Sequence, residues 1–246
     1  MRKDILTLFA VLIMIIPRLL HAGFGTIMED GLLVPSFLGY QCFEGTGYDR
    51  DEVWTEVLGS GGTINEDYTD TVLQGSQSLY LERSSASNYI HRTITASGTV
   101  YVKLLWRPVS LSTSGSHINI VGLFNSDLTT TGALFGVVYN TETSTFRWLA
   151  SDGTSSFISS DDLNIATGHY FTIWIKYVKG TGVDGVLTMW YARDSTKFPG
   201  DSVYVASTIS GGNTIDIEKI WISSGGSSSC IIDMIGIAST FEGLPW

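Results

Sequence analysis

The stretch TVYVKLLWR, residues Thr99–Arg107, shows most directly how this chain folds. Polar or aromatic side chains occupy one set of alternate positions: Tyr101, Lys103 and Arg107. Apolar side chains occupy the other set: Val100, Val102, Leu104 and Trp106. A period of two is typical of a β-strand with one side in a core and the other side facing outward. This stretch therefore predicts a strand of a sheet that covers a core.

The same alternation recurs along the chain, between connections rich in Ser, Thr, Gly and Asp that have the composition of hairpin turns. The predicted strands are 117–124, 133–140, 145–150, 170–178, 186–193, 214–223 and 230–239, with shorter ones at 40–44, 54–58 and 78–82. We find no amphipathic helix of useful length. The pattern predicts an all-β, two-sheet antiparallel jelly-roll sandwich over residues 40–246.

Composition and charge narrow the possible partners. The 246 residues are 43% hydrophobic and 15% charged, and the formal net charge is −10. Nucleic acid is excluded as an expected partner, because a polyanion is bound by clustered Lys and Arg and this chain has no such cluster. An acidic surface suits divalent cations or neutral glycans.

The N-terminus has the layout of a secretory signal peptide. Arg2 and Lys3 precede the apolar run Ile5–Ile16, which is shorter than the roughly 20 residues of a membrane-spanning helix. We expect residues 1–22 to be a cleaved signal peptide, and the protein to be secreted or displayed on a virion or cell surface. Residues 23–39 are apolar and rich in glycine, and they are expected to form an extended arm, a linker or an added edge strand.

Short motifs at both ends of the predicted sandwich resemble the concanavalin A-like (laminin G-like) jelly-roll modules of secreted and phage-associated proteins. The motifs are CFEG at 42–45, WTE at 54–56, GSQSLYL at 75–81 and IDMIGI at 232–237. The resemblance implies that the first and last strands lie side by side in one sheet. It also implies a structural calcium ion held by Glu44 and Asp233, because calcium prefers carboxylate and carbonyl oxygens. Solvated acids at strand ends are the alternative.

Cys42 and Cys230 are the two cysteines of the chain. An even number of cysteines in an exported protein favours a disulfide between them. The register argues against it, because pairing Glu44 with Asp233 would put Cys42 opposite Ile235, five residues from Cys230. Two buried free thiols are the alternative.

One segment resembles a catalytic strand. Thr214, Asp216 and Glu218 would share one face, as do the Glu, Asp and Glu of laminarinase-type glycoside hydrolases on this fold. A retaining hydrolase needs two carboxyl groups about 5–5.5 Å apart, and here a threonine stands at the nucleophile position. An outward-facing polar strand edge is the simpler interpretation. The four histidines, His21, His91, His117 and His169, are scattered and have no metal-ligand spacing.

A carbohydrate-binding face is easier to assemble from the alternation. Its candidate residues are aromatic and cationic: Tyr101, Lys103, Arg147, Trp174, Lys176 and Trp190. Aromatic rings stack on the C–H faces of sugars while neighbouring polar groups bind the hydroxyls. We place Trp174 on the less buried face of its strand, because the alternate residues 171, 173, 175 and 177 form the more uniformly apolar set.

The sequence thus favours a non-catalytic, extracellular glycan-binding or adhesion module. A structural or assembly subunit, such as a virion decoration or an extracellular filament protein that docks through residues 23–39, is the alternative. A laminarinase-like hydrolase comes third.

Overall fold

The computed structural model describes residues 37–41, 43, 54–83, 88–114, 117–152, 156–158, 165, 168–182, 184–200, 214–242 and 244. These residues contain strands and turns but no helix, so none of them forms a helix long and apolar enough to cross a membrane. The predicted signal peptide and residues 23–36 of the predicted arm lie outside the described residues.

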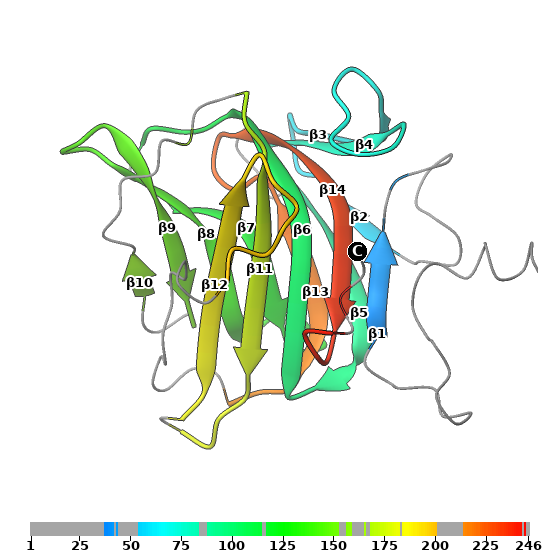
Figure 1. Cartoon of the computed structure of the whole chain (residues 1–246), viewed down its shortest axis with the longest axis vertical. Coiled ribbons are helices and arrows are strands. Elements are labelled where there is room, and N and C mark those ends of the chain that lie inside the picture. The colour runs from blue at the N-terminus through cyan, green and yellow to red at the C-terminus, as the bar shows by residue number, and fades with distance from the viewer. Residues whose placement is uncertain are drawn as a thin grey trace, which may run out of the picture.

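Two antiparallel sheets pack face to face as a sandwich, which confirms the predicted fold class (Figure 1). In order across the front sheet, the strands are β12 (Val186–Arg193), β11 (Phe171–Val178), β6 (Thr99–Ser110), β14 (Ser229–Ala238), β4 (Ser78–Glu82) and β3 (Thr63–Tyr68), and β1 (Phe37–Gln41) also pairs with β14. The back sheet contains β10 (Ser156–Ile158), β9 (Thr145–Ser151), β8 (Thr131–Asn140), β7 (His117–Phe124), β13 (Ile217–Ser223), β5 (Tyr89–Ser97) and β2 (Thr55–Val57).

The opening and closing strands are neighbours, as the resemblance implied. Strand β1 runs antiparallel to β14, with Gln41 opposite Ile235. Phe43, two residues further on, is fully buried in the same core cluster as Ile232 of β14. The first and last strands of the described residues therefore lie side by side in the front sheet.

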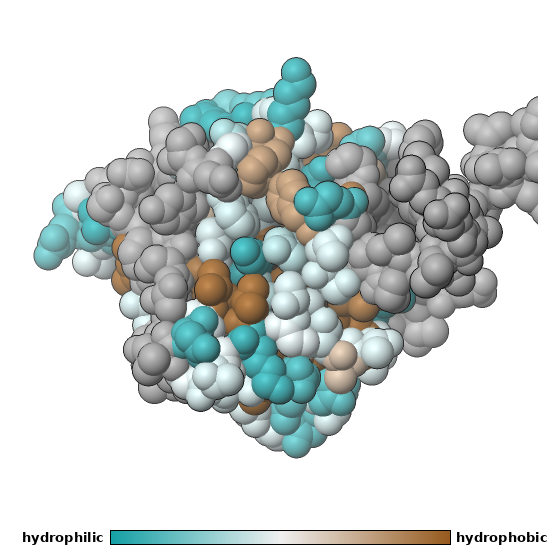
Figure 2. Space-filling model, turned by 60° about the horizontal axis from the view of Figure 1, so that its bottom comes forward, coloured by the Kyte–Doolittle hydropathy of each residue, from teal (hydrophilic) through white to brown (hydrophobic). Residues whose placement is uncertain are grey.

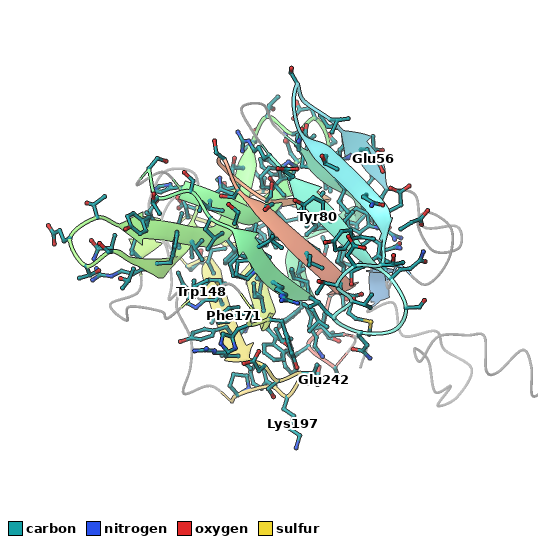
Figure 3. All side chains as sticks on the ribbon, turned by 90° about the horizontal axis from the view of Figure 1, so that it is seen from above. Glu56, Tyr80, Trp148, Phe171, Lys197 and Glu242 are labelled. Carbon is teal, nitrogen blue, oxygen red and sulfur yellow. The ribbon has the colours of Figure 1, made fainter. Side chains whose placement is uncertain are left out.

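Alternate side chains of the strands fill the space between the sheets. All four apolar residues of the opening stretch are buried there: Val100, Val102, Leu104 and Trp106. The ring of Trp148 from the back sheet lies 5.9 Å from that of Trp106 and 5.9 Å from that of Phe171 in the front sheet. Figure 3 shows Trp148 and Phe171 close together between strands of the two sheets. The alternation of period two was thus a correct guide to the core.

Some strands differ from the prediction. Strands β3, β5 and β10 were not predicted, because polar residues interrupt their alternation, as in YIHRTITAS of β5. Strand β13 begins at Ile217 rather than at Thr214. Strand β1 begins at Phe37, so residues 37–39 of the predicted arm belong to the sandwich.

The predicted disulfide lies partly outside the described residues, because Cys42 does so. Cys230 is a buried free thiol in this structure, and burial raises its pKa to about 12. Gln41, which precedes Cys42, is opposite Ile235, five residues along β14 from Cys230. At about 3.3 Å per residue this register does not favour the bond, which needs Cα atoms within about 7 Å.

Candidate functional site

Five of the six predicted binding residues lie together on the outer face of the front sheet. Trp174 of β11 pairs with Lys103 of β6 on one side and with Trp190 of β12 on the other. Lys176, two residues along β11, is opposite Tyr101. The ammonium of Lys103 is 5.6 Å from the ring centre of Trp174, and that of Lys176 is 5.9 Å from the ring of Tyr101. The face of Trp174 is the one that the alternation indicated.

This face is closed rather than open. Phe198, in the segment after β12, contacts Trp174 and Trp190 with ring centroids 5.4 and 5.6 Å apart. Phe241, in the segment after β14, contacts Phe198 at 4.8 Å and Tyr101 at 6.1 Å. Figure 3 shows Lys197 and Glu242, which belong to these two segments, on the outer side of the front sheet.

Phe198 and Phe241, which lie over the predicted face, limit how much of its side chains a ligand can contact. Trp174, Lys103 and Trp190 are only 2%, 3% and 8% exposed. Burial lowers the pKa of Lys103 to about 8. Trp174, Lys103 and Trp190 therefore present little surface to a ligand, whereas Tyr101 and Lys176 stay partly exposed. Figure 2, in which the bottom of Figure 1 is turned toward the viewer, shows brown apolar side chains in small groups among white and teal ones.

Arg147, the sixth predicted residue, is not part of this face. It lies on β9 of the back sheet, opposite Val138 of β8. Its neighbour Trp148 points into the core, so Arg147 points to the outer face of the back sheet. The sequence could not show this separation, because alternation identifies the side of a strand and not its sheet.

The structure describes only one of the two proposed calcium ligands, because Glu44 lies outside the described residues. Asp233 is fully buried, and its Oδ2 atom accepts hydrogen bonds from Gln74 N and Ser78 Oγ, both at 2.9 Å. Its Oδ1 atom accepts one from Met234 N at 2.8 Å. Because each carboxylate oxygen has two lone pairs, both lone pairs of Oδ2 are used by protein donors, and Oδ1 accepts from the protein as well. Nor does any group of three or more His, Cys, Asp or Glu side chains come together as a metal site within the described ranges. Calcium binding stays a prediction.

The two carboxylates of the hydrolase alternative have separate partners. Asp216 forms an ion pair with Lys179, with an N···O distance of 2.7 Å. Glu218 accepts a hydrogen bond of 3.1 Å from Ser126 N in the loop after β7. Thr214 and Asp216 precede β13 and are not part of it. The geometry agrees with the simpler interpretation, a polar edge that ties loops to the sandwich.

The outer face of the back sheet carries an aromatic site that the sequence analysis missed. Trp221 of β13 is opposite His91 of β5 on one side and Gly122 of β7 on the other. Ile220 and Ile222, the neighbours of Trp221, are in the core, so Trp221 points outward. We name this surface the Trp221 face and define it by Tyr89, His91, Asn119, Gly122, Phe124, Lys219 and Trp221.

Three rings adjoin one another on the Trp221 face, and we call them the aromatic shelf. They are not coplanar: the Trp221 ring is inclined by 49° to that of Tyr89 and by 72° to that of Phe124. The Trp221 ring lies 5.4 Å from that of Tyr89 and 6.3 Å from that of Phe124, centroid to centroid. All three side chains are partly exposed. Gly122 makes room for the shelf, because a Cβ atom there would collide with the ring of Phe124 and lie 3.0 Å from that of Trp221.

Polar groups flank the shelf on both sides. The Nδ1 atom of His91 and the Oδ1 atom of Asn119 are buried, and no protein group is within hydrogen-bond reach of either atom among the described residues. Burial, followed by the positive charge of Lys219, lowers the pKa of His91. Lys219 itself pairs across the sheet with Phe124 and Thr93. Sequence reasoning missed this site because residues 89, 122 and 221 meet only through pairing of distant strands. The one available signal was the outward position of Trp221 between two isoleucines.

Comparisons with known proteins agree on the fold. No family model and no curated protein matches the sequence. Among solved structures, the chain is similar to the cellulose induced protein Cip1, with a TM-score of 0.53, 18% identity and coverage of 82% of this chain and 97% of that one. It is also similar to an endo-beta-1,4-glucuronan lyase from the fungus Trichoderma reesei, with a TM-score of 0.51, 11% identity and coverage of 84% and 97%. The alginate lyase Aly36B has a TM-score of 0.50, 12% identity and coverage of 67% and 81%.

These identities are low, so the likeness concerns the fold alone. The chain shares its all-β sandwich with proteins of this kind.

Proposed function

We propose that this protein is a non-catalytic, exported glycan-binding module, and that the glycan rests on the Trp221 face. One observation carries the proposal: Trp221, Tyr89 and Phe124 form a partly exposed aromatic shelf on the outer face of the back sheet. The axial C–H groups of sugar rings stack on aromatic rings. Because the rings are inclined to one another, a sugar that stacks on one of them is flanked by the others.

Two polar side chains lie beside the rings of the aromatic shelf. His91 is the cross-strand neighbour of Trp221, and Asn119 lies on β7 beyond Gly122. A buried polar atom without a partner costs about 1–3 kcal/mol of stability, so such atoms are expected where a ligand supplies the missing bond. His91 Nδ1 and Asn119 Oδ1 fit that description.

Other observations support the glycan class more generally. The solved structures with the same fold include two lyases named for glucuronan and alginate. A catalytic role is not part of the proposal, because Asp216 and Glu218, the carboxylates with a hydrolase-like spacing, engage Lys179 and Ser126 instead of each other. Export, and with it adhesion at a surface, rests on the basic and apolar N-terminal pattern.

Binding to a panel of soluble and insoluble polysaccharides tests the proposal, with the variant Trp221→Ala beside the wild type. We expect the wild type to bind at least one member, and the variant to lose about ten-fold in affinity, which corresponds to about 1.4 kcal/mol, because it removes the central ring on which the sugar stacks. Tyr80→Ala is the matched control, since Tyr80 stacks on Tyr68 at 5.0 Å on the front sheet.

The control should bind as the wild type does. Unfolding curves of both variants must show a folded protein at the assay temperature. If no polysaccharide binds, or if Trp221→Ala binds as tightly as the wild type, the Trp221 face is not a glycan site.

A further inference from the structure

Lys219 is a cation on the Trp221 face, and the stacking of a sugar on the aromatic shelf does not by itself require a cation. Across the back sheet, Lys219 is opposite Phe124 of β7 on one side and Thr93 of β5 on the other. No carboxylate pairs with its ammonium anywhere in the part of the chain that the structure describes. The adjacent Glu218 is instead bonded to the backbone of Ser126.

The charge of Lys219 affects His91, which belongs to the Trp221 face. Burial is the largest cause of the lowered pKa of His91, and the positive charge of Lys219 is the second; no acidic group among the described residues offsets that charge at His91. The chain as a whole has a net charge of −10, so a cation that has no carboxylate partner among the described residues is unusual for this surface. Lys219 lies two residues from Trp221 on the same strand, about 6.6 Å along it. A substituent on a sugar stacked on Trp221 would reach that distance.

We infer that the Trp221 face selects glycans that carry an anionic substituent, a carboxylate or a sulfate ester, and that Lys219 is the residue that selects them. The inference rests on the proposed function, because it assigns the class of ligand to the same site. Arg147 is on the same outer face, three strands from β13, or about 14 Å at the usual strand spacing. An extended anionic chain that crosses the strands would pass from one cation toward the other.

Paired probes test the inference with the full-length protein. Each charged polymer is matched with a neutral one of the same backbone: polygalacturonate with its methyl ester, and dextran sulfate with dextran. We expect the wild type to bind a charged member at least ten-fold more tightly than its neutral partner at 50 mM NaCl. The preference should shrink at 500 mM NaCl, because salt screens charges at an exposed site.

Lys219→Gln should abolish the preference for the charged member of each pair, whereas Lys219→Arg, which keeps the charge, should retain it. Lys176→Gln is the control, since it removes a cation that lies over Tyr101 on the front sheet. A preference for only one of the two charged polymers identifies carboxylate or sulfate as the substituent.

Three outcomes would overturn the inference: equal binding of charged and neutral members, failure of both charged polymers to bind, or an intact preference in Lys219→Gln. The proposed function survives each of them if a neutral glycan still binds and Trp221→Ala loses it. It fails if no polysaccharide binds, or if Trp221→Ala binds as tightly as the wild type.

Discussion

The rings of Phe198 and Phe241 lie 4.8 Å apart and together cover the outer face of the front sheet, although their segments follow different strands (Figure 1). Phe198→Ala should expose Trp174 and Trp190, because Phe198 contacts both rings. We expect a red shift of tryptophan emission, stronger quenching by acrylamide and a loss of about 1–2 kcal/mol in the free energy of unfolding. Leu58→Ala, at an apolar side chain that is 61% exposed, is the control and should change none of these three quantities. Unchanged quenching in Phe198→Ala would contradict the cover.

Two glycines of the back sheet should respond differently to alanine. At Gly122 the new Cβ would meet the rings of Phe124 and Trp221, which can tilt away. Gly122→Ala is therefore expected to weaken glycan binding several-fold and to alter the near-UV circular dichroism with little loss of stability. At Gly136 the Cβ would meet the backbone carbonyl of Ile118, which cannot move without disturbing the pairing of β7 with β8. Gly136→Ala should lower the free energy of unfolding by more than about 1 kcal/mol. Equal stability losses in the two variants would refute this difference.

Binding of a sulfated glycan should depend on pH through His91. Lys219 on β13 and Tyr89 on β5 face His91, and Glu56 lies on the adjacent strand β2. The pKa of His91 is below its ordinary value of 6.5, so the ring is neutral at pH 7.5. As the pH falls below 6.5, protonation adds a second cation beside Lys219, and the affinity for dextran sulfate should rise. A sulfate ester keeps its charge over this range, so the ligand does not titrate. His91→Gln should bind equally at pH 5.5 and 7.5; a rise of the same size in that variant would rule out His91 as the cause.

Lys103 should make the stability of the protein depend on pH at the alkaline end. Its pKa is about 8 in the folded protein and near 10.5 when unfolded. Between these values the unfolded chain holds more protons, so this residue destabilises the fold at neutral pH and does so less as the pH rises above 8. Lys103→Met should therefore be more stable than the wild type at pH 7, and its advantage should shrink by pH 10. Urea unfolding of both proteins at the two pH values measures this difference; a constant difference would show that Lys103 keeps an ordinary pKa.

Calcium is tested by chelation. If Glu44 and Asp233 hold the ion, EDTA should lower the melting temperature of the wild type and have little effect on Glu44→Ala. Calcium-saturated EDTA controls for ionic strength. A wild-type melting temperature that EDTA leaves unchanged would remove calcium and leave Asp233 as a hydrogen-bond acceptor for Gln74, Ser78 and Met234.

Much of the architecture could be predicted from local pattern. Strands Ser78–Glu82, His117–Phe124 and Val186–Arg193 have the predicted bounds, and the closing strand begins one residue earlier than predicted. The outward position of Trp174 was also correct. These features follow from the alternation of side chains in an extended chain, which each segment carries by itself. Strand β5 escaped prediction because polar residues stand on its open face and the alternation is irregular there.

Only the tertiary structure decided which outer face is open. Phe198 and Phe241 cover one aromatic face, whereas Tyr89, Gly122 and Trp221 come together on the other from three distant parts of the chain. Alternation tells on which side of a strand a residue lies. The neighbours of that strand, and the segments that fold back over it, depend on contacts between residues far apart in sequence, and no local pattern encodes them.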